Sequence, residues 1–357
     1  MEKLVVGIDF SKETMNFCCL QGSADRIVLE GVVTNNREGC QEMVRVLRAL
    51  QRGLKVFDFL FCGENTGCYS LEVADYLFSK KYVIWLENPL QIKLSSGMRR
   101  EKTDAADARM IAEYAFRYRD KLKAYNPQSK GIQKLKAWLK THDRLTGIKI
   151  SLQNLVQSMA VVPCTLQQTL KDIAARLKET DRQIRELLRK EEEFSMNASL
   201  MISVPGISYI SAAAILVDTR NFTRFINPRQ YATHVGCVPH KHDSGTTVHR
   251  KPKVSKASNR YINSLLTQGA VSLMTHNKEI KEYASRKNKE GKHNGCIINN
   301  IRNKTIHRLF AVIREQKKFD RNYRGEMQKK EFLQMQTGET PFKNFLQGKC
   351  IKSLVKS

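Results

Sequence analysis

The sequence predicts an α/β domain at the N-terminus, a helical arm after it, and a mostly α-helical domain toward the C-terminus. Three observations support this. Short apolar runs alternate with helical periodicity over the first third of the chain, long stretches of three- and four-residue apolar spacing follow, and positive charge is concentrated after residue 125. With 357 residues, of which 41% are hydrophobic and 27% charged, the composition is that of a globular protein with two or three domains.

Residues 1–125 are expected to form one α/β domain. Its strands are expected at Val5–Phe10, Asn16–Leu20, Ile27–Val33, Phe57–Cys62 and Tyr82–Leu86. Its helices are expected at Asn36–Leu50, Leu71–Phe78 and Asp104–Phe116. Three strands followed by alternating helices and strands indicate a mixed sheet, and this order of elements is that of the RNase H fold.

Four carboxylates fall where this fold can bring them together. Asp9 ends the first strand, Glu64 follows the fourth, and Asp104 and Asp107 share one face of the third helix. Packing like charges together is costly unless cations neutralise them, and all-oxygen ligand sets favour Mg²⁺ or Mn²⁺, often as a pair about 4 Å apart. We therefore expect these residues to form a metal-binding catalytic site. The alternative for the two helix acids is solvation on a helix surface.

Residues 126–198 are expected to form a helical arm. Apolar residues recur in steps of three and four over 132–159 and again over 166–187, with Pro163 between them. Because proline interrupts a helix, the pattern predicts two long helices that form a bent or antiparallel coiled-coil pair. We expect the arm to space the domains and to pair with another chain.

Residues 199–325 are expected to form a mostly α-helical DNA-binding domain, followed by a basic tail over 326–357. Pro205, Gly206 and Ile207 lie between two apolar helical stretches and resemble the turn of a helix-hairpin-helix, whose backbone N–H groups bind a DNA phosphate. Ser208 replaces the second glycine usual in such a turn, so an ordinary helix–helix turn is the alternative.

The charge of the chain predicts a polyanionic partner. The formal net charge is +26, and residues 1–125 carry 19 Lys and Arg against 17 Asp and Glu, whereas residues 126–357 carry 42 against 18. Between Asp243 and Glu279 there is no acidic residue, which favours a phosphate-binding surface over a merely solvated one. The basic residues that we expect to contact nucleic acid there are Arg250, Lys251, Lys253, Lys256 and Arg260.

Motifs along the chain resemble those of the DEDD transposases of bacterial insertion sequences. They are GIDFSKET, CGENTGCYS, KTDAADARMIAEYA, VPGISYISAAAIL and RFINPRQYATHVGCVPHKHDSGTTV, in this order, and the resemblance covers about residues 4–315. That group includes recombinases guided by a bridge RNA and is related to site-specific DNA invertases. The resemblance implies a first domain similar to a Holliday-junction resolvase, with Asp9, Glu64, Asp104 and Asp107 as the metal-binding residues.

The resemblance also implies a nucleophilic serine in the second domain, which matches Ser244 of the DSG triplet. From the residues alone, Ser244 would be interpreted as a turn residue, and His240 and His242 as bystanders or as groups that orient it. One departure from the family pattern is Ser258, at a position where the family usually has glycine.

The function implied by the resemblance is transposition or recombination of DNA. The partners implied are donor and target DNA, a structured guide RNA, Mg²⁺ or Mn²⁺, and further copies of the chain in a homodimer or homotetramer. The alternatives are a site-specific DNA invertase, a structure-selective endonuclease of the Holliday-junction type that uses water, and a non-catalytic nucleic-acid-binding protein.

The sequence predicts a protein of the bacterial cytoplasm, associated with the nucleoid when bound to DNA. No stretch approaches the roughly 18 consecutive apolar residues of a membrane span, and MEKLVVGIDF does not have the pattern of a signal peptide. The nine cysteines are scattered without a C-x-x-C pair, which indicates reduced thiols and neither a disulfide framework nor a zinc site.

Overall fold

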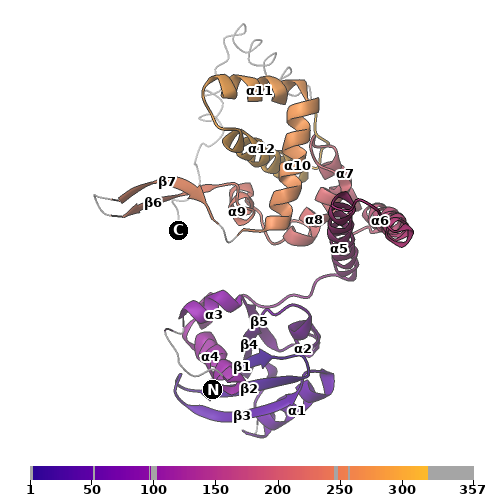
Figure 1. Cartoon of the computed structure of the whole chain (residues 1–357). Helices are drawn as coiled ribbons and strands as arrows, with labels where there is room; N and C mark the ends of the chain where they lie inside the picture. The colour runs from indigo at the N-terminus through magenta and orange to yellow at the C-terminus, as the bar shows by residue number, and fades with distance from the viewer. Residues whose placement is uncertain are drawn as a thin grey trace, which may run out of the picture. The chain divides into compact units, whose positions relative to one another are not determined.

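The computed structural model describes residues 3–50, 53–95, 97, 103–244, 248–255 and 258–320. The chain divides into two compact units, residues 1–128 and 129–357, each with its own hydrophobic core (Figure 1). Lys256 and the expected basic tail lie outside the described residues. Within the described ranges, no helix is both long enough and apolar enough to cross a membrane.

The first unit is built on a five-stranded mixed sheet in the order β3-β2-β1-β4-β5. The strands are β1 (Leu4–Phe10), β2 (Thr14–Gln21), β3 (Ile27–Thr34), β4 (Phe59–Glu64) and β5 (Val83–Glu87). Strand β2 is antiparallel to β1 and β3, whereas β4 is parallel to β1 and β5. This order and these directions are those of the RNase H fold, so the α/β fold predicted for this part of the chain is confirmed.

Two local predictions differ from the structure. Strand β4 begins later than the sequence predicts, because the 3-10 helix η1 (Val56–Asp58) precedes it and is closed by a 2.7 Å hydrogen bond from the Lys55 N–H to the Asp58 carboxylate. The strand also ends later than expected, and Glu64 is its last residue. A short helix that the sequence pattern did not predict, α3 (Pro89–Ser95), follows β5.

Helices cover both faces of the sheet. On one face, α1 (Arg37–Ala49) and α2 (Cys68–Ser79) pack on Val6 and Ile8 in one hydrophobic cluster. On the other face, α4 (Asp104–Arg117) packs on β1 and β2. Because alternate residues of a strand face opposite sides, Gly7 and Asp9 lie on the α4 side of β1.

The second unit begins with two long antiparallel helices, α5 (Lys130–Gln157) and α6 (Cys164–Lys190). Their direction follows from two pairs of contacts: Lys134 Nζ lies 3.9 Å from Glu191, and further along α5, His142 Nε2 lies 3.1 Å from Asp181. The start of α5 and the end of α6 join the core of this unit. The remaining helices are α7 (Ser195–Ile202), α8 (Tyr209–Thr219), α9 (Pro228–His234), α10 (Arg260–His276), α11 (Lys278–Lys289) and α12 (Asn294–Glu315).

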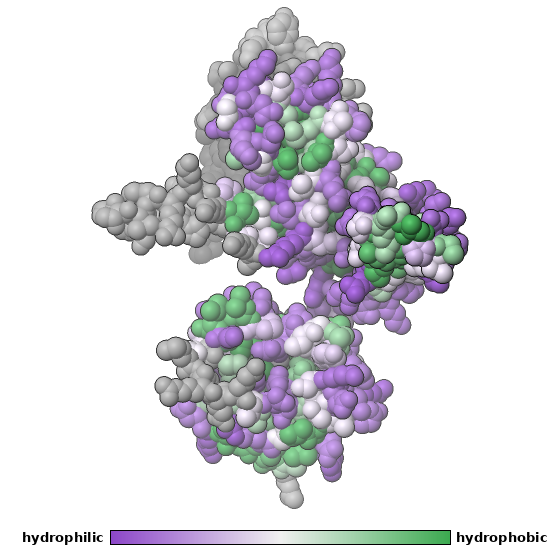
Figure 2. Space-filling view, viewed as in Figure 1, coloured by the Kyte–Doolittle hydropathy of each residue, from purple (hydrophilic) through white to green (hydrophobic). Residues whose placement is uncertain are grey.

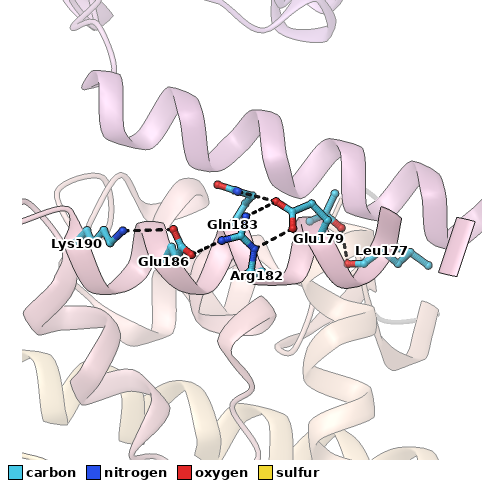
Figure 3. A network of polar contacts seen from close by, with 7 residues as sticks. Leu177, Glu179, Arg182, Gln183, Glu186 and Lys190 are labelled. Atoms are coloured by element: carbon cyan, nitrogen blue, oxygen red, sulfur yellow. Dashed lines mark hydrogen bonds and ion pairs between the residues drawn. The ribbon is translucent and has the colours of Figure 1, made fainter. Parts of the chain in front are cut away.

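A ladder of charged side chains follows the exposed face of α6 (Figure 3). Arg182 donates at 2.7 Å both to Glu179 and to Glu186, and Lys190 donates to Glu186 at 3.4 Å. Hydrogen bonds from Arg182 and then from Gln183 lower the pKa of Glu179 to about 2. Residues three and four positions apart are neighbours on a helix, so these pairs favour the helical conformation of a segment with a large solvent-exposed surface.

A two-stranded antiparallel hairpin, β6 (Pro239–Ser244) and β7 (Val248–Val254), interrupts the helices of the second unit. It projects away from α9 and α10 (Figure 1). The sequence predicted a mostly helical domain here and did not predict the hairpin, so this part of the fold prediction was incomplete.

Candidate active site

Helix α4 packs directly on β1 because Gly7 has no side chain. A Cβ atom at Gly7 would lie 2.2 Å from the backbone nitrogen of Ala112 and 2.4 Å from the backbone oxygen of Ala108, well inside van der Waals contact. Ala108 and Ala112 are themselves small and buried. The close approach brings the first turn of α4 near the end of β1, where Asp9 lies on the same face.

The first turn of α4 carries two of the predicted carboxylates. The helix begins at Asp104 because the side chain of Thr103 accepts a 3.2 Å hydrogen bond from the N–H of Ala106. Asp104 is exposed and Asp107 is half-buried. Both lie at the positive end of the helix dipole, which favours negative charge.

The four predicted carboxylates influence one another's protonation. Burial, followed in order by the negative charges of Asp107, Asp104 and Glu64, raises the pKa of the half-buried Asp9 from 3.8 to about 6. Burial and the charge of Asp107 raise the pKa of Glu64. The structure therefore brings Asp9, Glu64, Asp104 and Asp107 into one electrostatic neighbourhood at the edge of the sheet.

The chemistry of these side chains fits a hard divalent cation, because all their donor atoms are carboxylate oxygens. A cation would also relieve the repulsion that raises the pKa of Asp9. As the side chains stand, no three His, Cys, Asp or Glu residues in the described part of the chain lie close enough to hold one ion together. Coordination of one ion by three of these carboxylates together would require at least one of them to move, and Asp104 is exposed.

A fifth carboxylate that the sequence interpretation missed lies at the same edge of the sheet. Glu87 is the last residue of β5 and pairs in register with Glu64 of β4. It accepts hydrogen bonds from the Tyr114 hydroxyl at 3.2 Å and from the Asn88 N–H at 2.7 Å. The sequence signal that could have identified Glu87 is its position, because the parallel strands β4 and β5 both end in glutamate.

In the second unit, Ser244 is the last residue of β6, and its Cα atom pairs with that of Val248 across the hairpin. The structure describes the backbone of residues 240–244 and 248–253 and not their side chains. The facing strand β7 carries Arg250, Lys251 and Lys253, and Arg260 is exposed in the first turn of α10. The serine and three of the predicted basic residues thus share one hairpin.

The predicted phosphate-binding turn lies between α7 and α8. Gly206 has φ +86°, and a Cβ atom there would lie 2.7 Å from Leu273 of α10, so the turn requires glycine and packs on that helix. The side chain of Ile207 is buried, and its N–H donates to the Val204 carbonyl at 3.2 Å. Ile207 therefore contributes to the core, and phosphate binding by this turn stays a prediction.

A sheet of this strand order with carboxylates at its edge is typical of enzymes that cleave or transfer nucleic-acid strands. A family model described as Transposase, of the DEDD type named for IS110, matches residues 6–163. A second, described as Transposase IS116/IS110/IS902 family, matches residues 198–285. The chain belongs to this family of insertion-sequence transposases.

Similar proteins come from several bacteria. The pilin gene-inverting protein of Moraxella bovis is 26% identical over 326 residues, which cover 90% of this chain and 99% of that protein. The transposase for insertion sequence element IS1111A of Coxiella burnetii is 21% identical over 357 residues, which cover 88% and 91%. A structure of T. thermophilus RuvC in complex with Holliday junction substrate is 17% identical and covers 35% of this chain and 100% of that chain; its TM-score of 0.25 is too low to establish a common fold.

Proposed function

We propose that this chain catalyses the DNA strand cleavage and exchange that move an insertion sequence, with Asp9, Glu64, Asp104 and Asp107 holding divalent cations, Mg²⁺ or Mn²⁺. The observation that carries the proposal is the raised pKa of Asp9, to about 6, through burial beside three further carboxylates. Such an arrangement is unfavourable for stability and is typical of catalytic sites. Cations bound there supply stabilisation of the charge that develops on the phosphate and the leaving oxygen.

Ser244 is the proposed nucleophile. Its hydroxyl oxygen attacks a DNA phosphorus atom, the bond from phosphorus to one sugar oxygen breaks, that oxygen takes up a proton, and the DNA strand stays linked to the protein. A serine hydroxyl needs a base or a polarised phosphate to react. The support is family membership together with position: Ser244 lies on a hairpin whose other strand carries Arg250, Lys251 and Lys253, residues that attract a phosphate.

The test of the carboxylate site is cleavage of labelled DNA that contains the element ends, with Mg²⁺ or Mn²⁺ present. Asp9→Asn, Glu64→Gln and Asp104→Asn should each lower the cleavage rate by about a hundredfold or more, since each removes a charge that stabilises the transition state. Binding of DNA should stay unchanged. The matched control is Glu42→Gln, which neutralises an exposed acid on α1 that pairs with Arg45. Wild-type cleavage in any of the three site variants would contradict the assignment.

Site-specific inversion is a second candidate function. It is favoured by the pilin gene-inverting protein, which aligns with 90% of this chain. The two functions differ in their products: a DNA segment flanked by inverted sites changes orientation under inversion, whereas a donor circle joins a separate target under transposition. A structure-selective endonuclease of the Holliday-junction type would instead leave free ends with no DNA linked to the protein. A plasmid that carries both kinds of site separates these outcomes in one reaction.

Donor and target DNA and a structured guide RNA are the proposed partners. The support is the excess of 42 Lys and Arg over 18 Asp and Glu in residues 126–357. The test is binding of a structured RNA transcribed from the DNA beside the coding sequence, measured against an unrelated folded RNA of equal length. Equal affinity for both RNAs across a range of salt concentrations would show that the RNA is bound only by non-specific electrostatic attraction.

A homodimer or homotetramer is the proposed active form. Large apolar side chains are exposed toward the far end of the α5–α6 pair, where Figure 2 shows a green patch: Ile150 is 52% exposed, Leu155 43% and Val161 84%. Exposed apolar groups that gather in one place mark contact surfaces. Light scattering should show an oligomer for the wild type and a smaller species for Leu155→Glu and Val161→Glu. An unchanged mass for both variants would show that the interface between subunits lies elsewhere on the chain.

A further inference from the structure

The hairpin that carries Ser244 is attached to the helices mainly at its base. In the described part of the chain, β6 and β7 pack chiefly on each other. The two ends of the hairpin meet closely, because Gly236, with φ +75°, lies against Ser258, and a Cβ at Gly236 would be 2.7 Å from the Ser258 Cβ. The Asn259 N–H donates to the His234 carbonyl at 3.1 Å across the same point.

Two asparagine side chains hold the segment that leads into β6. Asn263 of α10 donates from Nδ2 to the Val235 carbonyl at 2.8 Å, and Asn299 of α12 donates from Nδ2 to the Cys237 carbonyl at 2.8 Å. The two carbonyls are two residues apart and lie four and two residues before Pro239, where the strand begins. Two helices that are separate in sequence therefore fix the direction in which β6 leaves the helical core.

One arginine orients both asparagines. Arg302 of α12 donates from Nη2 to the Asn299 Oδ1 at 2.7 Å, and from Nη1 to the Asn263 Oδ1 and to the Thr267 Oγ1, the latter at 3.0 Å. A guanidinium can only donate, so it accepts no hydrogen bond from an amide NH₂ group. Each asparagine must therefore present its oxygen to Arg302 and its NH₂ group to the base of the hairpin. The planar fork of arginine lets one side chain do this at two sites at once.

We propose that Arg302, Asn263 and Asn299 form a clasp that positions the hairpin and, through it, Ser244. The inference rests on the proposed function of Ser244 as the nucleophile. Ser244 lies five residues beyond Pro239, which at about 3.3 Å per residue is roughly 17 Å from the base. At that distance a tilt of about 5° at the base displaces the serine by about 1.5 Å, and a displacement of about 1 Å can lower a reaction rate a hundredfold.

The clasp residues are positioning residues that are separate from the hydrophobic core. All three are half-buried, whereas the core of this unit is formed by apolar residues of α5 to α10 and α12. Substitution of a clasp residue should therefore leave the helical core folded and loosen the hairpin selectively. This difference between local and global effects makes the proposal testable.

The experiment combines hydrogen exchange with kinetics on the full chain. Arg302→Ala should speed backbone amide exchange in residues 239–254 about tenfold, by releasing the base of the hairpin. It should lower the rate of protein–DNA adduct formation at saturating DNA about a hundredfold. The Kd for DNA and the Tm should stay close to wild type. Arg302→Lys should restore the rate only in part, because a lysine lacks the fork that reaches both asparagines.

Two further variants sharpen the test. Asn299→Asp keeps the shape of the side chain and its contact with Arg302, yet a carboxylate cannot donate to the Cys237 carbonyl, so this variant should loosen the hairpin as well. Lys304→Ala is the matched control: it removes one positive charge from α12 at a residue that pairs with Glu279 at 3.4 Å. It should leave hairpin exchange and rate unchanged.

The proposal is overturned if Arg302→Ala and Asn299→Asp match Lys304→Ala in hairpin exchange and rate. It is also overturned if exchange rises equally through all helices of the unit and the Tm falls with the rate, because the residues would then serve the fold as a whole. Ser244→Ala tests the nucleophile independently of the clasp. An adduct that persists in Ser244→Ala contradicts the proposed nucleophile, whereas hairpin exchange in the clasp variants still decides whether the clasp holds the hairpin.

Discussion

Asp9 at the end of β1 and Asp107 in the first turn of α4 repel each other, and this repulsion is the largest electrostatic contribution, after burial, to the raised pKa of Asp9, about 6. The two residues are 98 positions apart in the sequence. They meet because the missing side chain of Gly7 lets the backbone of α4 approach β1. The fold therefore maintains an unfavourable interaction that a bound cation removes.

The first prediction concerns pH and stability without divalent cations. The pKa of Asp9 in the folded protein, about 6, is above its value of 3.8 in an unfolded chain. The folded state therefore binds the proton more tightly, and stability falls as pH rises from about 4 to about 6. Asp9→Asn removes this loss and should stabilise the protein at pH 7.5 by about 1 kcal/mol, a figure reduced for the partial exposure of the carboxyl.

Denaturant unfolding in EDTA at pH 4 and pH 7.5 measures this effect. The stability difference between Asp9→Asn and wild type should be larger at pH 7.5 than at pH 4. Equal differences at the two pH values would mean that the protonation of Asp9 is not coupled to folding.

The second prediction concerns metal binding measured without catalysis. Mn²⁺ should raise the Tm of the wild type, because a ligand that binds only the folded state adds about 1.4 kcal/mol at ten times its Kd. Asp9→Asn should show little or none of this rise, and Glu42→Gln should show all of it. A thermal scan over a series of Mn²⁺ concentrations measures both. An identical rise in Asp9→Asn would place the cation elsewhere.

The third prediction concerns the packing of α4 on β1. Gly7→Ala should destabilise the protein by about 1–3 kcal/mol through overpacking, since its Cβ would lie 2.2 Å from the Ala112 backbone nitrogen. It should also abolish the Mn²⁺-dependent rise in Tm by displacing Asp104 and Asp107. Gly147→Ala in α5 is the control: a Cβ there meets nothing within 4 Å, and alanine favours a helix. Normal Mn²⁺ binding in Gly7→Ala would show that the close packing of α4 on β1 is not needed to form the cation site.

The fourth prediction concerns salt. Affinity for DNA and RNA should fall steeply with salt, and replacing Arg250, Lys251 and Lys253 together with glutamine should lower the slope by about one unit for each lost phosphate contact. An equal change of charge on α6 serves as the control, at the exposed residues Lys171, Arg176 and Lys178. A slope that stays the same in the hairpin variant would show that this strand is only solvated.

The sheet and the carboxylates were predictable from the sequence because their signals are local. Short apolar runs, and period-two alternation in β3, mark the strands of the first unit, and Thr103 caps α4 directly before Asp104. The convergence of Asp9 and Glu64 follows from the parallel pairing of β1 and β4, which the order of elements predicts. The sequence did not reveal that Gly7 allows the backbone of α4 to pack closely on β1, because a single glycine in a strand does not indicate which element packs against it.

The hairpin and its clasp were not predictable for a physical reason. Strands β6 and β7 are largely polar, PHKHDS and VHRKPKV, so the apolar alternation that identifies a half-buried strand is missing. Asn263, Asn299 and Arg302 are polar residues on helices and would be assigned to the surface by periodicity alone. Only the folded chain shows that they meet at the base of β6.

The most direct test of the proposed chemistry is a denaturing gel of the protein incubated with labelled DNA and Mg²⁺. We expect a protein–DNA adduct for the wild type and for Ser264→Ala, a control at an exposed serine of α10. We expect no adduct for Ser244→Ala or Asp9→Asn, although both still bind the DNA. An adduct that persists in Ser244→Ala would contradict the proposed serine nucleophile, and so would cleavage by the wild type that leaves no DNA attached to the protein.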